Sequence, residues 1–96
     1  MIIEVTARHF NVPDYIRDYA ELEVQKLKKF NDRITRCQVL LSHEHNQHTA
    51  ELNLSLPGQR LHSKVSTDNL TKSIDTAMTK MEHRLRKYMG KLQKHY

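Results

Sequence analysis

Residues 49–56, with the sequence TAELNLSL, decide the fold of this chain of 96 amino acids. Leu52, Leu54 and Leu56 alternate with polar residues, and Ala50 continues the alternation toward the N-terminus. Alternation with a period of two is typical of a β-strand with one buried face and one face in water. Helices are therefore expected to cover one side of a sheet whose other side is polar.

The residues before this segment predict its partner strand. Positions 33–45 also alternate, with Cys37, Val39 and Leu41 on one face. Asn46-Gln47 lies between the two alternating runs and is expected to form a tight hairpin turn, although it lacks the glycine that such turns favour. The two runs are therefore expected to pair as antiparallel strands.

Two more strands complete the expected sheet. Pro57-Gly58 is a typical turn pair, and the strand over 60–66 that follows it has Leu61 and Val65 facing inward. At the N-terminus, β-branched residues alternate over Met1–Thr6 and predict a short first strand. A helix separates this strand from the next one, so the two are expected to be parallel if they are adjacent.

The first helix is predicted between these two strands, from Pro13-Asp14 to about Lys29. Proline suits the first turn of a helix, and the aspartate carboxylate suits its positive end. The apolar residues recur at steps of four and three and form one stripe, made of Ile16, Ala20, Val24 and Leu27. Asn31-Asp32 is the expected stop signal.

A second, longer helix is predicted from the caps offered by Ser66-Thr67-Asp68 to near the C-terminus. Its apolar stripe consists of Leu70, Ile74, Ala77, Met78, Met81, Leu85, Tyr88 and Leu92. The predicted fold class is α+β, a two-layer sandwich of order βαβββα, in which a four-stranded sheet carries both helices on one face. Residues 1–96 are expected to form a single domain, because a chain of this length supports one modest core.

Composition excludes several classes of protein. Cys37 is the only cysteine, so the chain has neither a disulfide framework nor a zinc site with several cysteines. No apolar run approaches the roughly 18–20 residues that span a bilayer, and the N-terminus lacks the pattern of a secretory signal. We therefore expect a cytoplasmic protein that makes no contact with a membrane.

Positive charge is concentrated in the C-terminal part of the chain. The net charge is +5, from 16 basic and 11 acidic residues. Residues 1–59 hold seven basic and eight acidic side chains, whereas residues 60–96 hold nine and three, a net of +6. Such a concentration favours a polyanionic partner, most often a nucleic acid. A helix face that only keeps the protein in solution is the alternative.

The candidate RNA-binding residues on the second helix are Lys80, Arg84, Arg86, Lys87, Lys91 and Lys94. All of them except Arg86 are spaced by four, three, four and three residues and form one line along the helix. This line lies about 100° around the helix axis from the apolar stripe, and Arg86 lies further round. The end of the first helix adds Lys26, Lys28 and Lys29. The alternative, that these side chains only cover apolar neighbours, explains the line less well. Like charges in a row repel one another, and carboxylates that would pair with them are nearly absent from this helix.

No catalytic or metal-binding pattern is present in the sequence. His43, His45 and His48 lie in HEHNQH, which fails the zinc-protease pattern HExxH because Gln47 stands at the last position. Surface histidines near a hairpin are the expected state. Asp75 and Glu82 are each expected to pair with a nearby lysine or arginine. We expect no enzyme, no metal and no cofactor.

The order of the elements and several motifs resemble a known family. The start follows the form MxIxVTxR over residues 1–8, and the first helix contains Ile16-Arg17 and then KLKKF over residues 26–30. The segment SIDTAMTKMEHRLRK, residues 73–87, resembles a pattern of an Ala-Ile-Asp or Ala-Ile-Asn step, then Lys-Leu-Glu and Gln-Leu-x-Lys. The places of these steps are taken here by Ser73-Ile74-Asp75, Lys80-Met81-Glu82 and Leu85-Arg86-Lys87. Over nearly the whole chain this resembles the ribosome hibernation promoting factors, a family that includes the ribosome-associated inhibitor A proteins.

The resemblance implies a function in translation. Members of this family bind the small ribosomal subunit in stationary or stressed cells, in the channel that holds mRNA and the aminoacyl- and peptidyl-site tRNAs. Their two helices contact the rRNA backbone, which implies contacts here from Lys26, Lys29, Lys80, Lys87 and Lys91. The implied mechanism is competitive occlusion of mRNA and tRNA, with binding that depends strongly on salt.

Three residues depart from the family pattern, and the length suggests a subtype. Glu23 stands where relatives often have a basic residue, Leu70 replaces a frequent tyrosine, and Arg84 replaces a frequent glutamine. The chain ends with the second helix, at Tyr96, which resembles the short hibernation factor. Relatives of that subtype act with a second small protein to pair ribosomes into inactive dimers. The expected partners are small-subunit rRNA and such a dimerising protein, and the free protein is expected to be a monomer.

Three other functions remain compatible with these residues. A double-stranded RNA-binding domain shares an αβββα core, but here a leading strand is added and the basic loop of such domains is absent. An oligomerising module with a basic surface for acidic proteins is a second alternative, and a metal-dependent enzyme built on the histidines is a third. Co-sedimentation with ribosomes separates the hibernation factor from all three.

Overall fold

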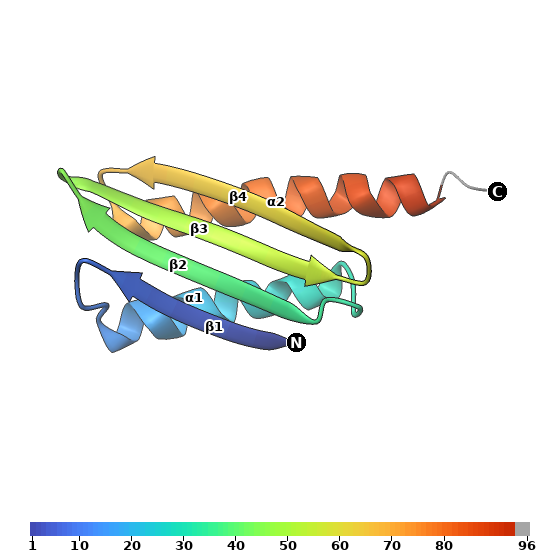
Figure 1. Cartoon of the computed structure of the whole chain (residues 1–96), viewed down its shortest axis with the longest axis horizontal. Coiled ribbons are helices and arrows are strands. Elements are labelled where there is room, and N and C mark those ends of the chain that lie inside the picture. The colour runs from blue at the N-terminus through green and yellow to red at the C-terminus, as the bar shows by residue number, and fades with distance from the viewer. Residues whose placement is uncertain (94–96) are drawn as a thin grey trace.

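The computed structural model describes the backbone of residues 1–93 and the side chains of residues 1–90. Its elements follow the predicted order βαβββα, with a short 3-10 segment after the first helix (Figure 1). Their bounds are β1 Ile2–Arg8, α1 Asp14–Gln25, the 3-10 helix η1 Lys26–Lys29, β2 Arg36–Glu44, β3 Gln47–Leu56, β4 Gln59–Thr67 and α2 Leu70–Gln93. The predicted strands and helices are therefore confirmed, with small shifts at their ends.

The four strands form one sheet in the order β1-β2-β3-β4. β1 pairs with β2 in parallel, and the two remaining pairs are antiparallel, as predicted. Figure 1 shows both helices behind the sheet, where α1 contacts β1 and α2 contacts β3 and β4. The predicted fold class, an α+β two-layer sandwich with both helices on one face of the sheet, is confirmed.

The core lies between the sheet and the helices. Val39 pairs with Leu52 and Leu41 pairs with Ala50, and all four side chains are fully buried. Met81 of α2 is also fully buried in the same cluster. Truncating a buried leucine of this kind to alanine typically lowers the free energy of unfolding by about 2–5 kcal/mol. The buried residues of the strands therefore contribute much of the energy that holds the helices on the sheet.

Cys37 lies on the buried face of β2, as the alternation predicts. Burial raises the pKa of its thiol to about 12, because the thiolate would lose its hydration there. A thiol in this state packs as a small apolar side chain.

The hairpin between β2 and β3 turns one residue earlier than predicted. Glu44 pairs with Gln47, so His45 and Asn46 are the central residues of the turn. Their φ angles are 51° and 62°, the two positive values of a type I′ turn. The prediction of Asn46-Gln47 as the turn is therefore wrong. The strand register it implies differs by two residues from the observed one, and both registers keep the apolar faces together, so alternation alone does not choose between them.

The other turn follows its prediction. Leu56 pairs with Gln59 across Pro57-Gly58, and Gly58 has a φ of 71°. Proline followed by a residue with positive φ is typical of a type II turn, which favours glycine at the second position.

The caps of α2 also differ from the prediction. Asn69, not Ser66-Thr67-Asp68, caps the helix, because its Oδ1 accepts a hydrogen bond of 2.9 Å from the backbone N–H of Lys72. Thr67 instead holds the preceding turn, where its Oγ1 accepts a bond of 3.1 Å from the N–H of Asn69. Four consecutive polar residues can each serve as a cap, and the choice among them depends on where the strand ends.

Candidate nucleic-acid interface

The predicted basic line runs along α2 beside its buried stripe. Lys80, Arg84 and Lys87 are exposed, whereas Met81 and Leu85, each one residue further along from a cation, are fully buried. One residue is a rotation of about 100° on a helix, so these cations lie on the flank of α2 next to the packed face. The flank of α2 therefore presents a row of positive charge.

The described part of the line ends at Lys87. Lys91 lies within α2, whose helical backbone continues to Gln93, but its side chain is outside the described residues. Lys94 lies wholly outside them. Their predicted roles stay predictions.

The cations of α2 lack carboxylate partners within residues 1–90. No ion pair in this range involves Lys80, Arg84, Arg86 or Lys87. The predicted pairing of Asp75 with a cation is wrong, because its carboxylate accepts a hydrogen bond from the hydroxyl of Tyr19 in α1. Neighbouring positive charges repel one another when no counterion lies between them, and an external polyanion would relieve this repulsion.

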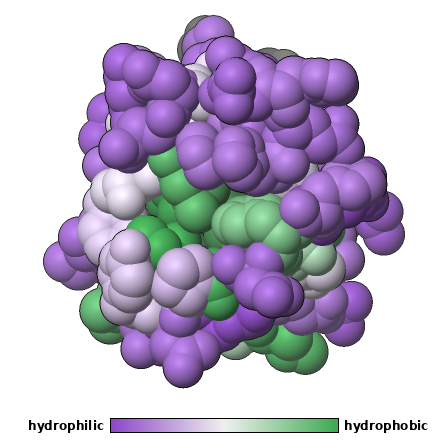
Figure 2. All heavy atoms as spheres, turned by 90° about the vertical axis from the view of Figure 1, so that its left-hand side faces the viewer, coloured by the Kyte–Doolittle hydropathy of each residue, from purple (hydrophilic) through white to green (hydrophobic). Residues whose placement is uncertain are grey.

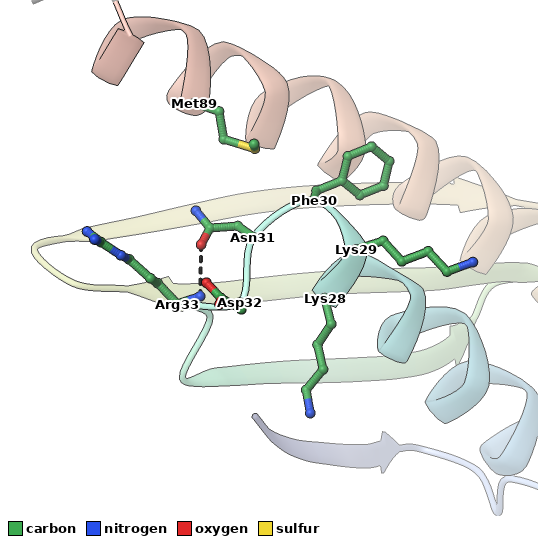
Figure 3. Close-up of a pocket in the computed structure, with 7 residues that line it drawn as sticks. All are labelled: Lys28, Lys29, Phe30, Asn31, Asp32, Arg33 and Met89. Atoms are coloured by element: carbon green, nitrogen blue, oxygen red, sulfur yellow. Dashed lines mark hydrogen bonds between the residues drawn. The ribbon is translucent and has the colours of Figure 1, made fainter.

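The basic cluster on the first helix is less uniform than the sequence suggests. Lys26, Lys28 and Lys29 lie in η1, and a 3-10 helix has three residues per turn, so the first and last of these positions align. Figure 3 shows Lys28 and Lys29 pointing in different directions. Lys26 Nζ lies 3.0 Å from Glu23 Oε2, so this lysine already has a partner.

Arg86 brings the two basic clusters together. Its guanidinium carbon lies 5.2 Å from the centre of the Phe30 ring, within the range of a cation–π contact. Phe30 directly follows η1, so the contact places the C-terminal half of α2 beside the end of the first helix. The two basic clusters, far apart in the sequence, therefore adjoin at this point.

A hollow opens where this contact is made. It has a volume of about 460 Å³ and is lined by residues 28–33 and by Met89 of α2 (Figure 3). We term it the turn pocket. Sequence reasoning missed it, because Phe30 and Met89 are far apart in the chain and only the packing of α2 brings them together. The run of two lysines followed by an aromatic residue, KKF, is the one local signal that points to it.

The hairpin histidines lie at the other end of the sheet. His43 and His48 stack with their ring centres 4.0 Å apart, and Phe10 meets His43 edge-on at 6.2 Å. Figure 2 shows this end of the molecule, where hydrophilic residues surround a patch of apolar surface. Among the described residues, no three potential ligands from His, Cys, Asp and Glu come together in a geometry that could hold a metal ion.

No helix among the described residues is both long enough and apolar enough to cross a membrane.

Solved structures share this architecture. A ribosomal subunit interface protein from Coxiella burnetii matches with a TM-score of 0.88 at 22% identity, over 94% of this chain and 99% of that one. The N-terminal domain of Protein Y from Thermus thermophilus matches with a TM-score of 0.83 at 27% identity, over 92% and 99%. The fold and the exposed cations thus define a small α+β protein with a basic helical face.

The sequence itself assigns the family. This chain belongs to the family described as sigma 54 modulation protein / S30EA ribosomal protein, which matches residues 3–93. The ribosome hibernation promoting factor of Escherichia coli K12 is 25% identical over 95 residues, which are 99% of this chain and 100% of the relative. That of Pseudomonas putida KT2440 is 26% identical over 93 residues, 97% and 91% of the two chains. The resemblance drawn from the motifs is confirmed.

Proposed function

We propose that this protein is a ribosome hibernation factor that binds the small ribosomal subunit through the basic face of its helices. The observation that carries the proposal is the row of exposed cations on α2, Lys80, Arg84 and Lys87, which have no ion pair within residues 1–90. Arg86 adds a further cation and adjoins the lysines of η1 through Phe30. The named relatives, which span nearly the same length, bear the name ribosome hibernation promoting factor.

The phosphates of folded rRNA are the ligand that this row suits. Steps of three and four residues correspond to about 4.5–6 Å along a helix axis, so one flank of α2 can follow successive phosphates of a strand. Each cation that neutralises a phosphate releases condensed counterions, and affinity therefore falls steeply as salt rises. Recognition of this kind reads the shape and backbone of the RNA, because the major groove of an A-form helix is too deep and narrow for side chains.

Inhibition of translation then needs no catalytic chemistry. A domain bound in the channel for mRNA and for the aminoacyl- and peptidyl-site tRNAs excludes both ligands sterically. We further propose that residues 1–96 act as one ribosome-binding domain, that the free protein is a cytoplasmic monomer, and that binding occurs in stationary or stressed cells. A second small protein would act beside it to hold two inactive ribosomes together.

Co-sedimentation with purified small subunits tests the proposal. The variant Lys80→Glu with Lys87→Glu reverses two charges on the flank of α2. The matched control is Arg60→Glu with Lys64→Glu, which makes the same change in net charge on exposed residues of β4. The α2 variant is expected to bind about tenfold more weakly or worse at moderate salt, because phosphate contacts dominate affinity. The control is expected to bind nearly as well as the parent protein.

Two outcomes would contradict this assignment. Full binding by the α2 variant would mean that the helix flank does not contact rRNA, and equal losses in both variants would mean that net charge alone matters. Sucrose-gradient profiles of whole ribosomes, with and without the protein, test the finer part of the proposal. Dimers and blocked single ribosomes separate in such profiles.

A further inference from the structure

The turn pocket combines an apolar floor with a cationic rim. Phe30 and Met89 are half-buried and pack against the core, and both contribute to the lining, so part of each side chain is accessible. Three exposed cations and one exposed carboxylate from residues 28–33 also line the pocket. The volume of about 460 Å³ lies within the general range of small-molecule pockets.

These features together favour one kind of ligand. A bare phosphate group would use the cations but not the aromatic and thioether groups of the floor. A base pair inside a duplex has no free face to place against Phe30. An unpaired nucleobase carries a π-face that stacks on aromatic side chains, and the phosphate attached to its sugar suits the rim.

Two neighbouring side chains add to the match. Arg86 holds its guanidinium carbon 5.2 Å from the centre of the Phe30 ring, and guanidinium planes also stack on bases. Asn31 Oδ1 accepts a hydrogen bond of 2.8 Å from the backbone N–H of Arg33. Its amide nitrogen has no partner within residues 1–90 and can donate to the polar edge of a base.

We propose that the turn pocket receives an unpaired nucleobase of the RNA whose phosphates the row on α2 contacts. The inference rests on the proposed function and adds to it one contact with a base, where the row on α2 contacts only backbone. Because Lys29 and Arg86 are part of the basic face, the base would enter the protein where the two basic clusters meet.

Two probes of similar charge separate base stacking from phosphate binding. One is a short single-stranded oligoadenylate RNA, and the other is inorganic polyphosphate of matched length, which has no bases. Phe30→Leu keeps an apolar side chain in the pocket but removes the aromatic face. Phe10→Leu is the matched control, because Phe10 contacts His43 and lies outside the pocket. Affinities are measured at low salt by competition with a fluorescent RNA.

Phe30→Leu is expected to weaken oligoadenylate binding about fivefold or more, as expected for the loss of one stacked base, and to leave polyphosphate binding unchanged. Phe10→Leu is expected to change neither. An equal loss for both probes, or no loss for RNA, overturns the inference. So does an acidic peptide containing phenylalanine that binds as well as the RNA and shows the same dependence on Phe30, because the pocket would then suit a protein partner.

Crosslinking of the unaltered protein gives a measurement that does not depend on the folding of a variant. Ribosomal small subunits or oligomers that carry 4-thiouridine are expected to crosslink to peptides containing Phe30 or Met89, and crosslinks confined to α2 upstream of Met89 would overturn the inference. The charge-reversal variants of α2 test the proposed function separately. If they abolish ribosome binding while Phe30→Leu leaves RNA affinity intact, the pocket assignment alone fails. If oligoadenylate binding depends on Phe30 but ribosomes are not bound, the proposed function alone fails.

Discussion

The hydroxyl of Tyr19 in α1 donates a hydrogen bond to the carboxylate of Asp75 in α2. This bond joins the two helices that carry the basic residues, and it occupies the carboxylate that the sequence assigned to a cation. The hydrogen bond to Asp75, followed by partial burial, raises the pKa of Tyr19 above its ordinary value, because both favour the neutral hydroxyl. The contact therefore links α1 to α2 and leaves the cations of α2 without this acidic partner.

Tyr19→Phe is expected to lower the free energy of unfolding by about 1 kcal/mol, because it removes one exposed hydrogen bond to a charged group. Urea denaturation followed by circular dichroism measures this change. Because the pKa of Tyr19 is raised in the folded state, the stabilisation by this hydrogen bond is fully present below the ordinary tyrosine pKa of 10.0 and is lost as pH rises above it. The difference between parent and variant should therefore shrink in strongly alkaline buffer.

Tyr15→Phe is the control for this prediction, because Tyr15 is 72% exposed. Its hydroxyl makes no hydrogen bond to another side chain among the described residues, so no change in stability is expected. Equal losses in the two variants would show that the bond to Asp75 contributes nothing.

Glu23→Gln is expected to increase the affinity for small ribosomal subunits by about two- to fivefold. The carboxylate of Glu23 lies 3.0 Å from Lys26 Nζ, and its removal frees that lysine for a phosphate. Titration of labelled protein with small subunits gives the affinity. Glu4→Gln makes the same change in charge and frees Arg36 in the sheet, where the two side chains are 3.3 Å apart. A similar gain from both variants would indicate an effect of net charge alone.

Lys87→Ala is expected to reduce the slope of log affinity against log salt concentration by about one, as expected for the loss of one phosphate contact. Lys64→Ala, an exposed lysine in β4, is expected to leave the slope unchanged. Binding is measured at several salt concentrations with the same preparation of small subunits. A slope that does not respond to Lys87 would exclude this side chain from the contact.

Much of the fold could be predicted from the sequence because each element has a clear period. The alternation of Leu52, Leu54 and Leu56 requires a sheet with one wet face, and the stripe through Met81 and Leu85 requires a helix on the other face. The same stripe also places the exposed cations of α2, because a fixed rotation separates each cation from its buried neighbour. These predictions depend only on local spacing.

The missed features depend on packing between distant segments. Arg86 and Phe30 meet only because the packing of α2 on the sheet places it beside the end of η1, and the spacing of the two residues in the sequence does not signal the contact. The bond from Tyr19 to Asp75 arises in the same way. The prediction of the hairpin turn failed for a different reason. Two strand registers satisfy the same alternation, and the choice between them depends on the backbone conformation at His45 and Asn46.

Replacing the hairpin turn with Asn-Gly, through His45→Asn and Asn46→Gly, is expected to raise the free energy of unfolding by about 0.5–1 kcal/mol. Both positions have positive φ, and Asn-Gly is the pair that a type I′ turn favours. Thermal denaturation measures the gain. The control is Gln47→Gly, which places glycine in the strand and is expected to destabilise the protein. A gain from that variant instead would support a turn centred on Asn46-Gln47.

Cys37 permits a prediction about alkaline pH. Its thiol is fully buried, and burial raises its pKa from 9.0 to about 12. Above a pH of 9.0 the unfolded chain releases the thiol proton while the folded chain keeps it, so the unfolded state gains stability as pH rises. The contribution of the neutral thiol to folding is therefore complete below that pH and is lost progressively as the pH approaches about 12.

Cys37→Ala isolates this effect, because all other groups titrate alike in the two proteins. At neutral pH the variant is expected to be less stable by about 1–2 kcal/mol, since a small cavity replaces the sulfur atom. As pH rises above 9.0 the parent protein alone loses the contribution of the thiol, and the gap between the two urea midpoints should narrow. A gap that stays constant between neutral and strongly alkaline buffer would mean that the thiol ionises equally in both states. In neutral buffer, a thiol reagent should modify Cys37 only at the rate at which the fold opens, because the thiolate is the reactive form and the buried thiol stays protonated.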